Sequence, residues 1–224
     1  MRIVLIGCGY WGKILLSKLK KFDDVKITIC SSKDNWKIQN MDWAFIATPN
    51  EMHYDQVKYY IEKGVNVFCE KPLTTTFEQS KELFDLAKKY NVKLYVDDVF
   101  NYRTERKDIK DLKKPINVIW NKVSDNTLYD LLYHDLYLLW PYYKYPYTDI
   151  KFTYGTSDDR MHKINHINLS NTENSNDALL DMIKEVLYGY PDYVNNKKIS
   201  LMCNKVIDKL QKEEETNEIC VYTR

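Results

Sequence analysis

Gly7-Cys8-Gly9-Tyr10-Trp11-Gly12 is the stretch that decides the fold, because it gathers three of the chain's six glycines. It has the pattern GxGxxG and lies between an apolar run at residues 2–6, typical of a buried strand, and a helical pattern at residues 12–22. The glycines permit a tight turn, close approach of a pyrophosphate and close packing of helix on strand, and the helix N-terminus offers free amides. The stretch therefore predicts a dinucleotide phosphate loop; the alternative is a glycine-rich turn that binds nothing.

Strand and helix patterns alternate for about a hundred residues around this loop. Further strands are expected near residues 25–29, 43–47, 65–68 and 94–96, and further helices near 53–63 and 77–90. Gly64 is placed to end the first of these helices. Alternation with short connections is the mark of a parallel, doubly wound sheet, so we expect an α/β fold with a Rossmann domain at residues 1–115.

The pattern changes beyond residue 115. We expect strands at 116–123, 150–154, 164–169 and 219–222, and helices at 126–140, 176–189 and 198–214. Because these elements no longer alternate regularly, they predict a reduced α+β C-terminal domain at residues 116–224.

Composition excludes several classes of protein. The 224 residues carry 33 basic and 32 acidic side chains, which gives no electrostatic case for nucleic acid or an anionic membrane. No apolar stretch approaches the ~20 residues of a membrane span, and the apolar N-terminus is too short for a signal peptide. Five cysteines without a CxxC pair fit a reducing compartment. We therefore expect a cytoplasmic protein without a nucleic-acid or membrane partner.

The end of the second strand bears on the choice of cofactor. A carboxylate that binds the adenosine ribose should lie there, about twenty residues beyond the loop. Ser31, Ser32 and Lys33 occupy that place instead, and Asp34 comes late. A small hydroxyl followed by a lysine suits a 2′-phosphate better than a free hydroxyl. The sequence therefore favours NADP(H) over NAD(H).

Three further segments occur in a familiar order. Ala47-Thr48-Pro49-Asn50-Glu51-Met52-His53 follows the third strand, Glu70-Lys71-Pro72-Leu73 follows the fourth, and Asp130-Leu131-Leu132-Tyr133-His134-Asp135 lies in a later helix. With these three segments and the glycine loop, the chain resembles the Gfo/Idh/MocA oxidoreductase family. The sequences at residues 7–13 and 96–103 resemble the nucleotide-sugar branch of that family, the UDP-N-acetylhexosaminuronate 3-dehydrogenases. The resemblance is specific over residues 1–140 and weaker at 176–222.

The resemblance implies an NAD(P)-dependent enzyme of carbohydrate metabolism that acts on a CH–OH group of a sugar or nucleotide sugar. The cofactor would be bound by Gly7, Gly9, Tyr10, Trp11, Gly12, Ser31, Ser32, Lys33, Thr48, Pro49, Asn50, His53, Glu70 and Lys71. Asn50 also suits a helix cap. The Lys71 ammonium can bind the reacting oxygen and stabilise developing negative charge, and Pro72 aims it by excluding helical geometry from the residue before it.

The resemblance places the acid/base group at His134, with Asp130 beside it. Residues four apart share a face of a helix, and a histidine can take the hydroxyl proton when the hydride leaves. Asp135 is expected only to support the helix. The plain alternative is a histidine on a helix surface.

Other candidates carry weaker signals. Tyr102 and Arg103 are expected substrate contacts, although Arg103 equally suits a solvated helix start. His162 and His166 are four apart, but no third ligand is evident nearby, so we expect no metal site.

The chain also departs from its relatives. Only residues 141–175 stand where the resembling enzymes carry a large antiparallel sheet, so the substrate wall and the face of an expected homodimer are both reduced. The segment between the second and third strands is short, so its helix is vestigial. Asp97 and Asp98 replace a small residue and a histidine. A non-catalytic dinucleotide sensor or partner subunit, or a small-molecule imine or biliverdin-type reductase, therefore stands as an alternative.

Overall fold

The computed structural model describes residues 1–31, 35–122, 127–143, 150–155, 161–170 and 177–215. By compactness the chain divides into a Rossmann unit, Met1–Asp97 with Leu179–Lys205, and a second unit, Asp98–Ala178 with the residues from Val206 on. This division falls at other points than the sequence-based boundary at 115/116. The last helices, assigned from sequence to the C-terminal domain, return in large part to the Rossmann unit.

The Rossmann unit is built on a five-stranded parallel sheet with the order β2-β1-β3-β4-β5. Its strands are β1 (Arg2–Ile6), β2 (Lys26–Cys30), β3 (Trp43–Ile46), β4 (Asn66–Cys69) and β5 (Leu94–Val96). The central strands are buried on both faces, which is why their sequences are continuous apolar runs. The predicted doubly wound α/β fold is confirmed.

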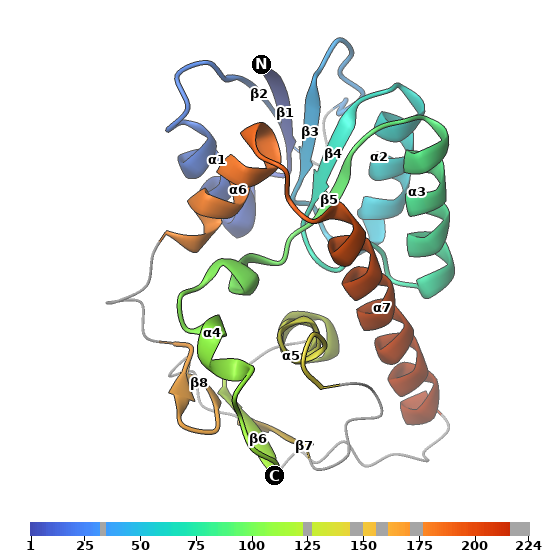
Figure 1. The fold of residues 1–224 in the computed structure, drawn as a ribbon. Helices are drawn as coiled ribbons and strands as arrows, with labels where there is room; N and C mark the ends of the chain where they lie inside the picture. Colours follow the sequence, from blue (N-terminus) through green and yellow to red (C-terminus); the bar gives the residue numbers. More distant parts are fainter. Residues whose placement is uncertain (32–34, 123–126, 144–149, 156–160, 171–176, 216–224) are drawn as a thin grey trace. The chain divides into compact units, whose positions relative to one another are not determined.

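Helices cover both faces of this sheet. They are α1 (Tyr10–Leu19), α2 (Asn50–Glu62), α3 (Phe77–Lys89), α6 (Ala178–Tyr188) and the first part of α7 (Tyr193–Glu215). Figure 1 shows α2 and α3 on one side of the sheet and α1 and α6 on the other. Gly64 follows α2 with a φ of 71°, the left-handed conformation that glycine adopts without strain, as expected.

An aromatic row crosses one face of the sheet. Phe45, Phe68 and Tyr95 are partners in register on β3, β4 and β5. Their rings stack with centroid distances of 4.7 Å and 6.3 Å. Because all three side chains are almost completely buried, they fix the register of neighbouring strands as well as filling the core.

The segment between β2 and β3 has no helix over the described residues 35–42, as the short spacing predicted. It is held instead by α2. The Tyr60 hydroxyl donates to the Trp36 carbonyl and accepts from the Ile38 N–H at 3.2 Å. Burial raises the pKa of Tyr60 to about 12, so the phenol stays neutral and keeps its donor.

The second unit contains a mixed sheet with the order β7-β6-β8-β9. Its elements are η1 (Val99–Tyr102), α4 (Arg106–Ile109), β6 (Ile116–Asn121), the π-helix η2 (Leu128–Leu132), α5 (Tyr133–Leu139), β7 (Ile150–Gly155), β8 (Met161–Ile164) and β9 (Ile167–Asn168). The sequence predicts one strand at 164–169, but Asn165 has a φ of 51° and turns the chain into a hairpin. The strand predicted at 219–222 lies outside the described residues.

A buried asparagine of α7 completes the edge of the Rossmann sheet. The Asn196 side chain accepts from the Val96 N–H at 3.0 Å and donates to the Val96 carbonyl at 2.8 Å. Asn196 is 4% exposed, so these two groups of β5 lie away from water. One amide side chain thereby takes the place of a sixth strand at this residue.

Asn196→Ala should destabilise the protein by about 2–4 kcal/mol, because two buried backbone groups lose their partner. Urea denaturation followed by far-UV circular dichroism measures the change. Asn195→Ala, one residue away and partly exposed, is the matched control. Equal stability of the two variants would contradict this role of Asn196.

Candidate functional site

Backbone hydrogen bonds continue the sheet of the Rossmann unit past the carboxyl ends of its strands. The first residue beyond a strand donates its N–H to the last residue of the neighbouring strand. The bonds are Gly7 to Cys30 at 2.9 Å, Ala47 to Ile6 at 2.8 Å, Glu70 to Ile46 at 2.9 Å and Asp97 to Cys69 at 2.9 Å. These four residues form what we call the edge row, and they begin the loops after β1, β3, β4 and β5, the first three of which were predicted to bind the cofactor.

The glycine loop fits a dinucleotide. A Cβ at Gly12 would lie 1.9 Å from the Gly7 carbonyl oxygen, and one at Gly7 would lie 2.2 Å from the Ala47 carbonyl oxygen. A Cβ at Gly9 would meet nothing within 4 Å. Two glycines are therefore required by packing, whereas Gly9 keeps open the space over the α1 N-terminus that a pyrophosphate needs. The first turn of α1 contains no acidic residue that would repel it.

Two aromatic residues flank this opening. Tyr10 and Trp11 begin α1, are 66% and 46% exposed, and contact each other edge to face at 5.4 Å. Their exposure is compatible with the predicted role in cofactor binding, which stays a prediction. Ser31 follows β2 directly, while Ser32 and Lys33 lie outside the described residues.

The loop after β3 is fixed from within. The Thr48 hydroxyl donates to Gln56 Oε1 at 2.7 Å, and Pro49 takes the N-cap position of α2. Asn50 is the first helical residue and is partly exposed, so it does not cap the helix. The cofactor contacts predicted for Thr48, Pro49 and Asn50 stay predictions.

His53 is buried behind the site. Its ring nitrogens lie 2.8 Å from the Pro72 carbonyl oxygen and 2.9 Å from the Thr48 carbonyl oxygen, and its side chain is inaccessible to solvent. Burial lowers the pKa of His53, although the two carbonyls oppose this shift. His53 thus lies between the loop after β3 and the loop after β4, and its neutral ring can donate to one of the two carbonyls. The cofactor contact predicted for His53 stays a prediction.

Lys71 follows the edge row at β4 and is partly exposed. The peptide bond that joins it to Pro72 is cis. Glu70, directly before it, is buried and hydrogen-bonded to the side chain of Asp97, which follows β5. The sequence indicated only that Asp97 adds negative charge; the register of β4 and β5 brings the two carboxyls together.

In the second unit, a network of aromatic rings holds His134. The Tyr137 hydroxyl accepts from the Phe100 N–H at 3.1 Å and lies 2.9 Å from His134 Nδ1. The Phe100 ring stacks on the imidazole with a centroid distance of 4.4 Å. His134 is 8% exposed, and these contacts fix the orientation of its ring.

Asp135 makes a second, fully buried network. Its carboxylate accepts from Trp120 Nε1 at 2.8 Å and lies 2.7 Å from His162 Nε2. The His162 ring also stacks on the Trp120 ring, with a centroid distance of 3.7 Å. Asp135 was expected only to support its helix, and its contacts with Trp120 and His162 also join that helix to β6 and β8.

Asp130, predicted to stand beside His134, lies in the π-helix η2. A π-helix has more residues per turn than an α-helix, so the face-sharing rule for residues four apart does not carry over to this segment. Asp130 is partly exposed and His134 is nearly buried. Their pairing stays a prediction.

The two predicted substrate residues lie near the network around His134. Arg103 stacks over the Phe100 ring with its guanidinium carbon 4.1 Å from the centroid and donates to the Leu169 carbonyl. Tyr102 ends η1 and is partly exposed. Arg103 therefore packs inside the second unit instead of starting a solvated helix, and its contact with substrate stays a prediction.

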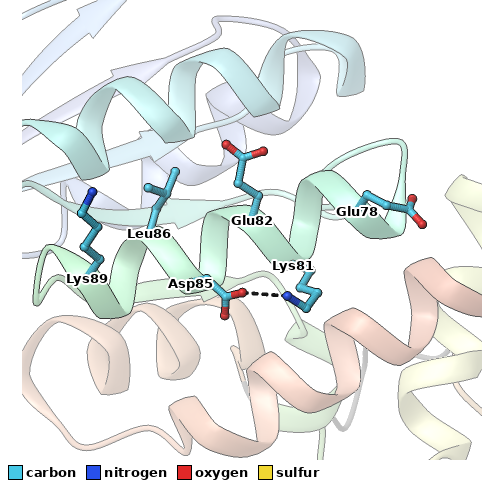
Figure 2. Close-up of a pocket in the computed structure, with 6 residues that line it drawn as sticks. All are labelled: Glu78, Lys81, Glu82, Asp85, Leu86 and Lys89. Carbon is cyan, nitrogen blue, oxygen red and sulfur yellow. Dashed lines mark hydrogen bonds and ion pairs between the residues drawn. The ribbon is translucent and has the colours of Figure 1, made fainter.

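A hollow on the outer face of α3 has a different character. Figure 2 shows its lining residues, which all come from one helix: Glu78, Lys81, Glu82, Asp85, Leu86 and Lys89. Lys81 bonds Asp85 at 3.0 Å, and Glu82 accepts from Lys58 of α2 at 2.8 Å. These groups pair with one another on the surface, which is typical of a solvated helix face.

Within the described ranges, no cluster of three or more His, Cys, Asp or Glu side chains is arranged to hold a metal ion. Nor does any helix in this part of the chain combine the length and apolar character needed to cross a membrane.

The fold, the glycine loop and the edge row define a Rossmann unit of the NAD(P)-binding class. Comparison with known families agrees. The model of the Gfo/Idh/MocA oxidoreductase family, NAD-binding Rossmann fold, matches residues 23–98. The matched segment begins just before β2, beyond the glycine loop, and ends at the two aspartates after β5, so it contains the loops after β3 and β4.

Individual relatives match over short segments. An uncharacterized oxidoreductase of Streptococcus pneumoniae is 27% identical over 117 residues, which cover 44% of this chain and 32% of the relative. The levoglucosan dehydrogenase of Pseudarthrobacter phenanthrenivorans is 43% identical over 58 residues, or 26% of this chain and 14% of the relative. This chain thus spans about a third or less of the length of the curated relatives that it matches first.

The whole chain also resembles a solved structure. The WlbA (WbpB) dehydrogenase from Thermus thermophilus, in complex with NAD and UDP-GlcNAcA, has a TM-score of 0.75 at 13% identity. The likeness covers 100% of this chain and 97% of that chain. At this identity it establishes the fold.

Two glycine substitutions should separate binding from folding. Gly9→Val places a side chain in the open space over α1, so the protein should fold normally and bind NAD(P)H more than about tenfold more weakly. Gly12→Ala should destabilise the fold itself, because its Cβ would meet the Gly7 carbonyl oxygen. Nicotinamide fluorescence measures the first effect and thermal unfolding the second. Undiminished binding by Gly9→Val would show that this loop is not the cofactor site.

Proposed function

We propose that the protein is an NAD(P)-dependent oxidoreductase that transfers a hydride between nicotinamide and a CH–OH group of a sugar or nucleotide sugar. One observation carries the proposal. The edge row sets a glycine phosphate loop and the loop that contains Lys71 at the same end of one parallel sheet. In open α/β sheets this end binds the ligand.

The nicotinamide supplies or accepts the hydride when the cofactor is bound. The glycine loop and the first turn of α1 hold the pyrophosphate, and Ser31, with Ser32 and Lys33, holds the adenosine ribose end. A lysine there favours the 2′-phosphate of NADP(H). His53 keeps the loops after β3 and β4 in fixed positions through its two carbonyl contacts.

Lys71 binds the reacting oxygen, and its ammonium stabilises the negative charge that develops when the hydride moves. His134 exchanges the hydroxyl proton at Nε2, because Tyr137 holds Nδ1. In the oxidative direction the hydroxyl oxygen loses its proton to His134, a bound nicotinamide would take up the hydride from the carbon, and a ketone remains. Asp130 assists His134 electrostatically, and Tyr102 and Arg103 contact the substrate.

The substrate class is supported by two of the similar proteins. One relative is a levoglucosan dehydrogenase, and the structurally similar WlbA binds UDP-GlcNAcA. Both act on or bind sugars, so we extend a sugar or nucleotide-sugar substrate to this chain. We also propose a homodimer, with the four-stranded sheet of the second unit as its interface.

Lys71→Ala should lower kcat by about 10²–10³-fold while leaving the affinity for NAD(P)H within about threefold, because Lys71 acts on the substrate oxygen. Turnover is measured with a panel of UDP-sugars and free sugars, and Lys81→Ala on the solvated face of α3 is the control. Cofactor binding without turnover of any substrate would contradict the enzyme and favour a dinucleotide sensor. Turnover of biliverdin or an imine alone would favour the other reductase class.

NADPH should bind more tightly than NADH, and Lys33→Ala should reduce this difference, because the lysine pairs with the 2′-phosphate. Titration of nicotinamide fluorescence gives both affinities. Lys37→Ala, four residues further on, is the control. Tighter binding of NADH by the wild-type protein would overturn the assignment.

A further inference from the structure

Two buried carboxyl groups lie in contact at the edge row. Glu70 and Asp97 are the first residues beyond the neighbouring strands β4 and β5, where Cys69 and Val96 are partners in register. The Asp97 N–H donates to the Cys69 carbonyl at 2.9 Å, which fixes the spacing of the two backbones. Glu70 is 8% exposed and Asp97 4% exposed, and their side chains share a hydrogen bond.

A hydrogen bond between two carboxyls requires a proton on one of them, since a carboxylate has no donor. Two ionised carboxylates in contact in a buried place would also repel each other strongly. Burial and the charge of Asp97 raise the pKa of Glu70 well above its usual range. Oε1 of Glu70 has no partner among the described residues, so a second negative charge there would lack compensation.

The surrounding groups leave one clear source of positive charge. The charged or titratable groups of the described residues that act on Glu70 include Asp97, Lys71 and the Cys69 thiol. The Cys69 thiol is fully buried, and burial raises its pKa, so it stays neutral. From α7 the pair is approached by a neutral residue, Asn196, which holds Val96 directly before Asp97.

We propose that Glu70 and Asp97 hold one proton between them at neutral pH and act as a positioning pair for Lys71. The pair then carries a single negative charge, which balances the single charge of the Lys71 ammonium. Asp97 is anchored in the edge row and by the bonds of its neighbour Val96 to Asn196, so the charge has a fixed position. Lys71 is thereby kept protonated and held at the end of β4.

The role assigned to Lys71 rests on the proposed function, whereas the shared proton does not. Loss of the last proton at high pH would leave two charges against one ammonium and draw Lys71 towards the pair. The activity should therefore fall at high pH, because the pair loses its shared proton. Asp97→Asn, which replaces the titrating partner with a permanent donor, should remove that fall.

The shared proton is tested without cofactor or substrate. In protein labelled with ¹³C at the Glu and Asp carboxyls, one resonance that is missing in Glu70→Gln should titrate well above the usual range of glutamate. In Asp97→Asn the Glu70 resonance should titrate at lower pH than in the wild type, and in Asp85→Asn, a surface control, it should not move. An ordinary glutamate titration in the wild type, or one unchanged by Asp97→Asn, would overturn the pair.

Unfolding in urea gives a second test that does not depend on Asp97→Asn folding well. A folded-state pKa above the unfolded value means that the native state binds more protons, so stability is full at low pH and falls as pH rises through the folded pKa. The denaturation midpoint of the wild type should decrease over this range relative to that of Glu70→Gln. Parallel pH dependence of the two proteins would overturn the inference.

The kinetic arm distinguishes this inference from the proposed function. If carboxyl titration behaves as described but no substrate is turned over, the proposed function fails and the proton-sharing pair stands. If turnover occurs and the alkaline fall in kcat persists in Asp97→Asn with KM unchanged, the positioning role of the pair is overturned.

Discussion

The row of backbone hydrogen bonds beyond the strands of the Rossmann sheet is the constraint on which the candidate site depends. Each bond joins the start of one loop to the end of the next strand, so Gly7, Ala47, Glu70 and Asp97 cannot move independently. Residues that are far apart in the sequence are thereby held next to one another along the carboxyl ends of the strands. The glycine loop, His53, Lys71 and the carboxyl pair are consequences of the same register. A slip of one residue in β4 or β5 would turn Glu70 and Asp97 to the wrong face of the sheet.

The fold could be predicted from sequence because each of its signals is local. Continuous apolar runs indicate strands buried on both faces, and a glycine with positive φ ends α2 where the sequence places one. The prediction of one strand at residues 164–169 was wrong, because the φ of Asn165 turns the chain back and this mixed polar and apolar segment joins two strands of a hairpin. The sequence-based domain boundary at 115/116 stays a prediction; division by compactness groups most of α6 and the start of α7 with the Rossmann sheet, and such a return of a helix leaves no mark in its own sequence.

The candidate site was predictable only in part, and for a related reason. Gly7, Gly9 and Gly12 are constrained by a short motif, and their packing matches the role that the motif gives to each. No short motif marks the partners of the two histidines. Tyr137 reaches His134 from the next turn, while Asp135 reaches His162 across 27 residues through the pairing of β6 with β8. The spacing of Asp130 and His134 places them on one face only in an α-helix, and the π-helix η2 changes the angular positions of its residues, so their pairing stays a prediction.

Asn196 has a consequence for how copies of this protein can associate. A sheet in an open α/β unit exposes two edges, and an exposed edge is a template for another strand. At β5 the N–H and carbonyl of Val96 are both bonded to the Asn196 amide, so an incoming strand would have to displace this buried side chain to pair there. The opposite edge is β2, where Ile29 is 47% exposed. Strand addition is thereby disfavoured at the carboxyl end of β5, directly beside the carboxyl pair.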